Sequence, residues 1–256
     1  MYKIIFWFCF MSFAIAGHSQ DVRLSPPRAS TGMAMVSRDK PAALTYDFRM
    51  QGSEIRYTTD GSQPSQKSKK YRKSIRISKP CTVKARAFHP DFKVSAVAES
   101  VFVSRGHTFS ILSATQPDTR YVAGGVSMLS DGLFGDTDFR QHYLGYDMGP
   151  VEIIINPDPK TEISLVNIAC MIRQGAWIFG PQSIRVFDGL GRQVGEELIH
   201  DASVSTDPCH RVIAIKTQAE RYSSLKIVVE PLSRIPDWHD GRGQPAWFFI
   251  DEIWIE

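Results

Sequence analysis

Apolar residues along this chain fall in short runs that end at glycine, proline or aspartate, and no segment keeps a helical period. Val83, Ala85 and Ala87, for example, alternate with Lys84 and Arg86. This period of two is the pattern of a strand with one buried face. The runs predict strands at Met33–Ser37, Ala43–Phe48, Glu54–Thr59, Ser74–Ser78, Cys81–His89, Val94–Val103, Val151–Ile155, Glu162–Ile172, Ser183–Phe187, Arg211–Lys216, Ser224–Glu230 and Trp247–Ile255. We therefore expect an all-β protein.

The last 22 residues combine a loop with a strand that closes the chain. Pro236–Pro245 is rich in Gly, Pro and Asp, and Ala246–Ile255 is an apolar, aromatic run typical of a buried strand. Asp251 and Glu252 interrupt this run. Since neighbouring side chains on a strand point to opposite faces, we expect the two carboxylates not to share one pocket. The carboxylate that faces inward needs a partner.

Charge divides the chain into two halves. Residues 21–105 contain 17 Lys and Arg against 7 Asp and Glu, a net of +10, whereas residues 106–256 contain 12 against 20, a net of −8. The 256 residues are enough for two domains, and their 43% hydrophobic and 22% charged content is ordinary for globular proteins. The asymmetry, with a junction at 104–106, predicts one β-sandwich at 24–104 and another at 107–256.

The N-terminus has the pattern of a secretory signal peptide. Lys3 precedes an apolar run, Ile4–Ala16, that ends in a small-residue cleavage pattern. We expect residues 1–19 to be removed and the protein to be periplasmic, cell-surface or secreted. The run is short for a transmembrane helix and no other segment could span a bilayer, so we expect no membrane anchor.

Three cysteines remain after such cleavage, namely Cys81, Cys170 and Cys209. Export permits disulfides, but an odd number leaves at least one thiol unpaired. Cys170 and Cys209 could pair, although a buried, free Cys170 fits its apolar run better. The spacing matches no zinc motif.

The first half contains IRYTTDGSQPS at Ile55–Ser65, Tyr71, and TVKARAF at Thr82–Phe88. In these segments it resembles the immunoglobulin-like domain found near the C-terminus of chitobiases and other β-hexosaminidases. It implies a fold and no catalytic role. The basic run Gln66–Arg76 can be interpreted as an anion-binding patch or as a solvated loop, and we favour the loop. Nucleic acid is not an expected partner of an exported protein.

The second half contains a series of distinctive segments, namely Gly124-Gly125, LSDGLFGD at Leu129–Asp136, Val151–Ser164, Gln174–Phe187 and WHDGRGQPAWFFIDEI at Trp238–Ile253. In these segments it resembles a discoidin-type, galactose-binding-like jelly roll. In bacterial family-20 β-hexosaminidases this domain follows the chitobiase-type domain, as here. The chain departs from the family at Asn156–Pro159 and Tyr143–Tyr146, so the family's ligand preference does not transfer.

The sequence favours a protein that is not an enzyme. The resembled hexosaminidases use an Asp-Glu pair on a barrel strand, but Asp251-Glu252 lies in the closing strand of a sandwich. A (β/α) barrel needs roughly 250 residues of its own. No nucleophile elbow, phosphate loop or metalloprotease helix appears.

The resemblance implies a structural calcium ion held by Asp131, Asp136 and Glu252. Carboxylate oxygens suit Ca²⁺. In the alternative, Asp131 makes a turn with Gly132, and Glu252 is hydrogen-bonded or paired with an arginine.

Sugar binding requires aromatic faces and polar groups at a loop rim. The candidate residues are His142, Tyr143, Tyr146, Trp238, His239 and Arg242. We expect Tyr143 and Tyr146 to be exposed and Trp177 to be packed, while Trp238-His239 could serve as a structural lock of its loop.

These observations predict an exported, non-catalytic accessory protein that binds a glycan in the context of hexosaminidase action. In the alternative it docks a partner, such as an exported glycoside hydrolase, without binding sugar, or it is a free-standing remnant of a hexosaminidase.

Overall fold

The computed structural model describes residues 20–136, 138–147, 149–199 and 208–256, so the predicted signal peptide at 1–19 lies outside the described residues. Apart from two 3₁₀ segments, η1 (Val126–Ser130) and η2 (Gln174–Ala176), the regular elements are strands. None of the described helical segments has the length and apolar character needed to cross a bilayer. The all-β prediction is confirmed.

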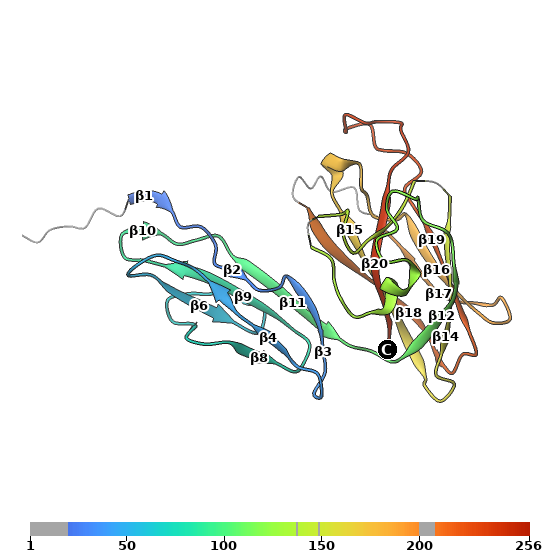
Figure 1. Cartoon of the computed structure of the whole chain (residues 1–256), viewed down its shortest axis with the longest axis horizontal. Coiled ribbons are helices and arrows are strands. Elements are labelled where there is room, and N and C mark those ends of the chain that lie inside the picture. Colours follow the sequence, from blue (N-terminus) through green and yellow to red (C-terminus); the bar gives the residue numbers. More distant parts are fainter. Residues whose placement is uncertain (1–19, 137, 148, 200–207) are drawn as a thin grey trace, which may run out of the picture. The chain divides into compact units, whose positions relative to one another are not determined.

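The strands before residue 105 form one larger sheet and three pairs (Figure 1). The larger sheet has the order β3-β11-β9-β6-β7, and the pairs are β1-β10, β2-β5 and β4-β8. The bounds are β1 Gln20–Arg23, β2 Arg28–Ala29, β3 Met33–Val36, β4 Ala42–Leu44, β5 Tyr46–Asp47, β6 Glu54–Thr58, β7 Lys69–Lys70, β8 Ile75–Ile77, β9 Cys81–Phe88, β10 Phe92–Lys93 and β11 Ala98–Ser104.

The alternation predicted for this region sets the inner face of its sheet. Val83, Ala85 and Ala87 of β9 are fully buried. Ile55 and Tyr57 of β6 lie opposite Ala87 and Ala85 in the antiparallel register, and they are buried too. Small side chains on β9 therefore leave room for larger ones on β6, and the polar residues between them face outward.

The remaining strands form one curled sheet with the order β12-β14-β19-β16-β17-β18-β15-β20-β13. Its halves meet at a single bridge, Gly195 with Thr217. A Cβ at Gly195 would lie 2.7 Å from the Lys216 carbonyl oxygen, so glycine permits this close approach. The bounds are β12 Phe109–Ala114, β13 Leu144–Tyr146, β14 Val151–Pro157, β15 Ile163–Ile172, β16 Ser183–Asp188, β17 Gln193–Leu198, β18 Cys209–Glu220, β19 Leu225–Glu230 and β20 Phe248–Ile255.

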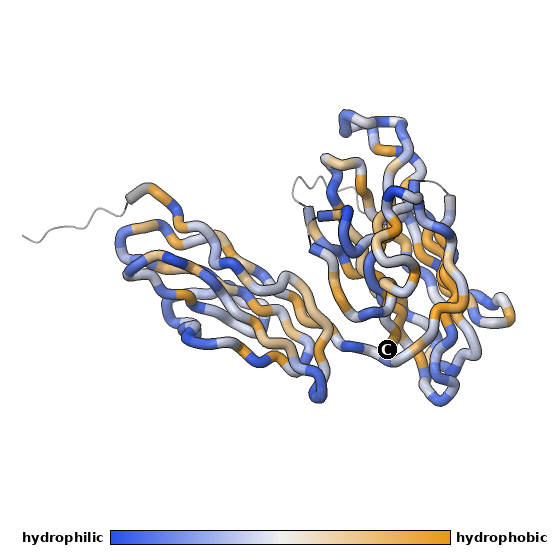
Figure 2. Tube along the Cα trace, viewed as in Figure 1, coloured by the Kyte–Doolittle hydropathy of each residue, from blue (hydrophilic) through white to orange (hydrophobic). Residues whose placement is uncertain are grey.

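The core of this sheet gathers side chains from both halves. Val151, Ile153 and Ile155 of β14 meet the inner faces of β15 and β20 in one cluster of buried residues. The most hydrophobic stretches follow the strands, whereas the connecting loops are mostly hydrophilic (Figure 2). Each fully buried aliphatic side chain contributes about 1.5–3 kcal/mol, so this cluster is the main source of stability in the region.

By compactness the chain divides into two units. The first comprises residues up to 30, 44–75 and 81–100, and the second comprises 31–43, 76–80 and 101–256. The domain limits drawn from the sequence stay predictions. Cys170, in β15, is buried and has a free thiol, as favoured above, and burial raises its pKa to about 12.

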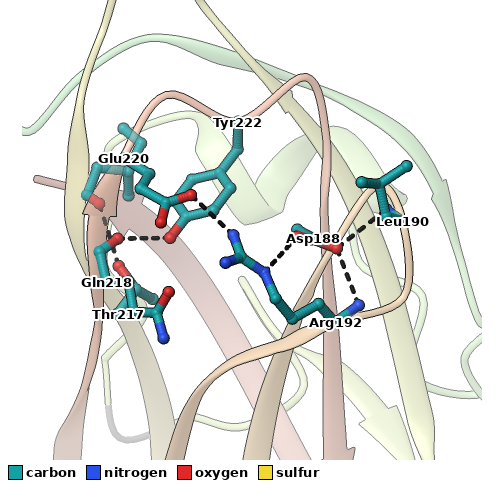
Figure 3. A network of polar contacts seen from close by, with 8 residues as sticks. Asp188, Leu190, Arg192, Thr217, Gln218, Glu220 and Tyr222 are labelled. Carbon is teal, nitrogen blue, oxygen red and sulfur yellow. Dashed lines mark hydrogen bonds and ion pairs between the residues drawn. The ribbon is translucent and has the colours of Figure 1, made fainter.

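A polar network closes the β16–β17 hairpin (Figure 3). Arg192 reaches Asp188 through Nε at 3.0 Å and Glu220 through Nη2 at 2.7 Å. Asp188 also accepts backbone hydrogen bonds from Leu190 and Arg192. The turn is thereby fixed, and it presents the Leu190 side chain at 95% exposure.

Candidate functional site

Two loops of the second unit, residues 173–179 and 235–247, are named here the tryptophan loops because they carry Trp177 and Trp238. Figure 1 shows η2 and the loop before β20 at the same end of the curled sheet. Arg173 and Ile178 bridge each other, with η2 between them. The Trp247 backbone amide donates to the Trp177 carbonyl at 2.8 Å, so a hydrogen bond joins the first loop to the residue just before β20.

The second tryptophan loop is closed at its neck by its own backbone. The Ile235 amide donates to the Gln244 carbonyl, and the Gly243 amide donates to the Ile235 carbonyl, both at 2.9 Å. Inside the loop, the His239 amide donates to the Pro236 carbonyl and the Arg242 amide donates to the His239 carbonyl. A segment rich in Gly and Pro is thus held in one conformation by main-chain hydrogen bonds.

His239 connects the two tryptophan loops. Its Nδ1 accepts from the Gly241 amide at 3.0 Å, and its Nε2 lies 3.0 Å from the Gln174 carbonyl oxygen. Because a carbonyl only accepts, Nε2 carries the ring proton and donates it. Both ring nitrogens are therefore used inside the protein. This contact supports the structural-lock interpretation of Trp238-His239.

Trp177 lies at the surface in an uncommon backbone conformation. Its φ is 64°, in the left-handed region that bulky residues rarely adopt, and its side chain is 40% exposed. The ring lies against Gly241, where a Cβ would come within 2.8 Å of Trp177 Cε2. The expectation that Trp177 is simply packed is therefore only half right. One side of the ring contacts the second loop, while a large part remains open.

Trp238 is the other exposed tryptophan among the described residues, at 44%. Its ring centroid lies 5.5 Å from that of His239 and 6.3 Å from that of the buried Phe179. Arg242 follows on the same loop and is also exposed. Two tryptophan faces with adjacent polar groups therefore occupy one end of the sheet.

A second aromatic group flanks the first loop. The Arg120 guanidinium lies 5.1 Å from the ring centroid of Trp247 and 5.7 Å from that of Tyr121. The pKa of Arg120 is raised through its hydrogen bond to Asp118. No sequence motif singles out Tyr121 or Arg120, because they lie far from Trp247 in the chain.

Tyr143 and Tyr146 are buried, so the expectation that they are exposed is wrong. Tyr143 precedes β13 and Tyr146 is its last residue, and β13 pairs with β20 in the closed sheet. The Tyr143 hydroxyl donates to the Asp136 carbonyl at 3.0 Å, and the Tyr146 hydroxyl donates to Thr115 at 3.2 Å. Neither ring offers a face to a ligand. His142, the residue before Tyr143, is exposed and has a φ of 56°.

Asp251 and Glu252 face the same loop, contrary to the expectation from strand alternation. Ala169 pairs with Glu252 and the next residue, Cys170, pairs with Ile250, so Asp251 is the extra residue of a β-bulge. Glu252 Oε2 accepts from Gly132 at 2.9 Å, and Asp251 Oδ2 accepts from Gly135 at 3.0 Å. The bulge brings both carboxylates, each 1% exposed, under residues 131–136.

We call Tyr143, His210, Asp251 and Glu252 the buried polar cluster. His210 Nε2 contacts the Tyr143 hydroxyl and lies 3.4 Å from Asp251 Oδ2. Burial raises the pKa of Asp251, an effect that its hydrogen bond to His210 opposes. Burial also raises the pKa of Tyr143 far above its usual value. Asp251 Oδ1 is buried and has no hydrogen-bond partner within the described part of the chain.

The predicted calcium ligands come together only in part. Glu252 has a pKa raised to about 9, first by burial and further by the charges of Asp131 and Asp251, and Asp131 hydrogen-bonds to it. The Asp136 carboxylate instead accepts from the Asp138 amide at 2.7 Å in its own turn. Within the described part of the chain, no three His, Cys, Asp or Glu residues form a group that could hold a metal. The arrangement thus fits a calcium ion incompletely, and calcium binding stays a prediction.

Comparisons with known proteins agree with the resemblance drawn from the sequence. Residues 44–102 match the family model described as Fn3 associated, and no curated protein matches the chain. Similar solved structures include the C-terminal domain of a chitobiase from Bacteroides fragilis, at 18% identity over 58% of this chain and 92% of that one, with a TM-score of 0.34. The family 32 carbohydrate-binding module of Streptococcus pneumoniae EndoD is 10% identical over 59% of this chain and 96% of its own, with a TM-score of 0.38. A SusE-like protein is 10% identical over 90% of this chain and 95% of its own, with a TM-score of 0.34.

Proposed function

We propose that this protein is exported, has no catalytic activity, and binds glycans through the tryptophan loops. The observation that carries the proposal is the pair of exposed rings, Trp177 and Trp238, on two loops fixed to each other through His239. Apolar faces of sugar rings stack on aromatic side chains, and rigid loops reduce the entropy lost on binding.

The backbone at Trp177 adds independent support. A left-handed conformation costs a bulky residue on the order of 1 kcal/mol, and such strain is often kept at binding sites. A glycine there would avoid the cost without placing a ring at the surface. The strained tryptophan is therefore better explained by a surface role than by packing alone.

Other parts of the proposal rest on the sequence. The apolar run Ile4–Ala16 supports export, and the resemblance to the non-catalytic end of family-20 hexosaminidases supports an accessory role beside glycan degradation. The two carboxylates of the closing strand are buried under a loop, which does not suit a glycosidase pair that must flank a substrate.

A glycan array probed with the purified protein tests the proposal, followed by titration of any positive N-acetylhexosamine or galactose glycan. We expect Trp177→Ala and Trp238→Ala to lower affinity at least about tenfold, as loss of a stacked aromatic contact does, while the folded state loses only about 1 kcal/mol of stability or less. Leu190→Ala is the matched control, because it removes an exposed apolar side chain outside the tryptophan loops. A folded protein that binds no glycan would overturn the proposal and favour docking to a partner protein.

A further inference from the structure

A cavity of about 520 Å³ in the first unit lies between the loop at residues 64–67 and the segment from β9 to Val94. Lys67, Arg86, Phe88, His89 and Phe92 contribute to its lining, and the lining contains no Asp or Glu. Its volume falls in the range of small-ligand pockets. We propose that this cavity binds an acidic sugar, with Arg86 and Lys67 holding a carboxylate or sulfate group.

Arg86 lacks the partner that its neighbours have. Its Nε is buried without a hydrogen-bond partner among the described residues. In the strand register Arg86 lies opposite Arg56, another cation. The nearby carboxylate of Glu54 is already held by Arg56 at 2.6 Å and by Lys70 at 2.8 Å. A buried donor without an acceptor and two like charges side by side both destabilise the fold. An oxyanion bound at Arg86 would accept from the donor and would also reduce the repulsion between the two arginines.

The aromatic part of the lining points to a sugar in preference to a simple anion. Phe88 and Phe92 are half-buried, so part of each ring is open. Phe92 meets the His89 ring at 5.1 Å and 67°, and His89 Nδ1 accepts from the Asp91 amide, which fixes the imidazole. Apolar ring faces beside a guanidinium match a saccharide ring that carries an acidic substituent.

The charge of the region favours the same class of ligand. Residues 21–105 carry 17 basic against 7 acidic residues, so an acidic glycan would be attracted to this part of the chain. Only Lys67 and Arg86 of those basic residues line the cavity. A nucleic acid is held by many phosphate contacts, whereas two cations beside open phenylalanine rings suit a short saccharide. The proposal is independent of the tryptophan loops.

Calorimetric titration of the whole protein tests the assignment with three probes, namely trigalacturonate, a heparin-derived tetrasaccharide and neutral chitotriose. The first two separate a carboxylate from a sulfate preference. We expect Arg86→Gln to weaken binding of the preferred acidic probe roughly tenfold or more, the usual effect of losing a charge-assisted hydrogen bond. Lys67→Gln should weaken it severalfold. Any chitotriose binding should be unaffected by both substitutions.

Lys73→Gln is the matched control. Lys73 is an exposed cation in the same basic run but is outside the cavity lining, so its loss should leave affinity nearly unchanged. Lys67 is exposed as well, so its variant remains informative if Arg86→Gln fails to fold. The proposal is overturned if Lys73→Gln and Lys67→Gln weaken binding equally, or if neither acidic probe binds. It is also overturned if inorganic sulfate or single-stranded DNA competes as well as the saccharide.

Discussion

The tryptophan loops and the buried polar cluster both adjoin β20 but use aromatic residues in opposite ways. Trp177 and Trp238 are exposed on loops whose polar groups bond to one another. Tyr143 is fully buried, and its hydroxyl satisfies a carbonyl and a histidine. A tyrosine whose hydroxyl finds hydrogen-bond partners inside the fold can be buried, whereas these tryptophans stay exposed on loops that are held by their own hydrogen bonds.

The largest expected difference between these regions is in stability. Tyr143→Ala should lower the free energy of unfolding by about 3–5 kcal/mol, because it leaves a cavity and removes the hydroxyl that hydrogen-bonds to His210. Trp238→Ala should cost about 1 kcal/mol or less, as an exposed side chain does. Urea denaturation of both variants measures the contrast. Equal losses would mean that Trp238 is a structural residue and that the comparison fails.

The fold could largely be predicted from the sequence, because most strands carry alternation or unbroken apolar runs. The sequence pattern does not predict three strands of the curled sheet, namely β12 (FSILSA), β13 (LGY) and β17 (QVGEEL). β12 has no buried residue, β17 has one, Val194, and β13 is only three residues long. Such strands are fixed by pairing with their neighbours, which a local pattern does not record.

The sites were less predictable, for identifiable reasons. The bulge at Asp251 shifts the core-facing positions of β20 by one, from Phe248 and Ile250 to Ile253 and Ile255. The sequence alone does not show this shift, because Phe249 and Trp254 are apolar too. The contact between Trp177 and Gly241 leaves no local signal, because it joins loops far apart in the chain. Tyr143 was misjudged because its burial depends on His210 and residues 131–136.

The buried polar cluster should also make stability depend on pH. Folding raises the pKa of Glu252 from 4.5 to about 9, so the folded state holds a proton that the unfolded state releases. This stabilisation is complete below pH 4.5 and is lost as pH rises toward 9, by up to about 1.4 kcal/mol per pH unit. Asp251, whose pKa is also raised, acts in the same direction. Denaturant unfolding at several pH values measures this slope.

Glu252→Gln serves as the control for the pH effect, because it keeps the hydrogen-bonding shape without the ionisation. Its slope between pH 5 and 8 should be clearly smaller than that of the original protein. A calcium ion at Asp131 and Glu252 would counteract the loss at high pH, since it replaces the proton. Millimolar calcium that raises the melting temperature at pH 8 only when Glu252 is present would support the calcium prediction, and no effect would contradict it.

The last prediction separates ring placement from folding in the tryptophan loops. Gly241→Ala puts a Cβ 2.8 Å from the Trp177 ring, so the ring must shift, at a cost of about 1–2 kcal/mol. Gly175→Ala, in the first loop, meets no atom within 4 Å and should be nearly neutral. We expect Gly241→Ala to weaken glycan binding severalfold, which titration with the best array glycan would measure, and Gly175→Ala to leave it unchanged. If both variants bind equally well, the position of Trp177 against the second loop does not matter for recognition, and Trp238 alone would remain as the aromatic contact.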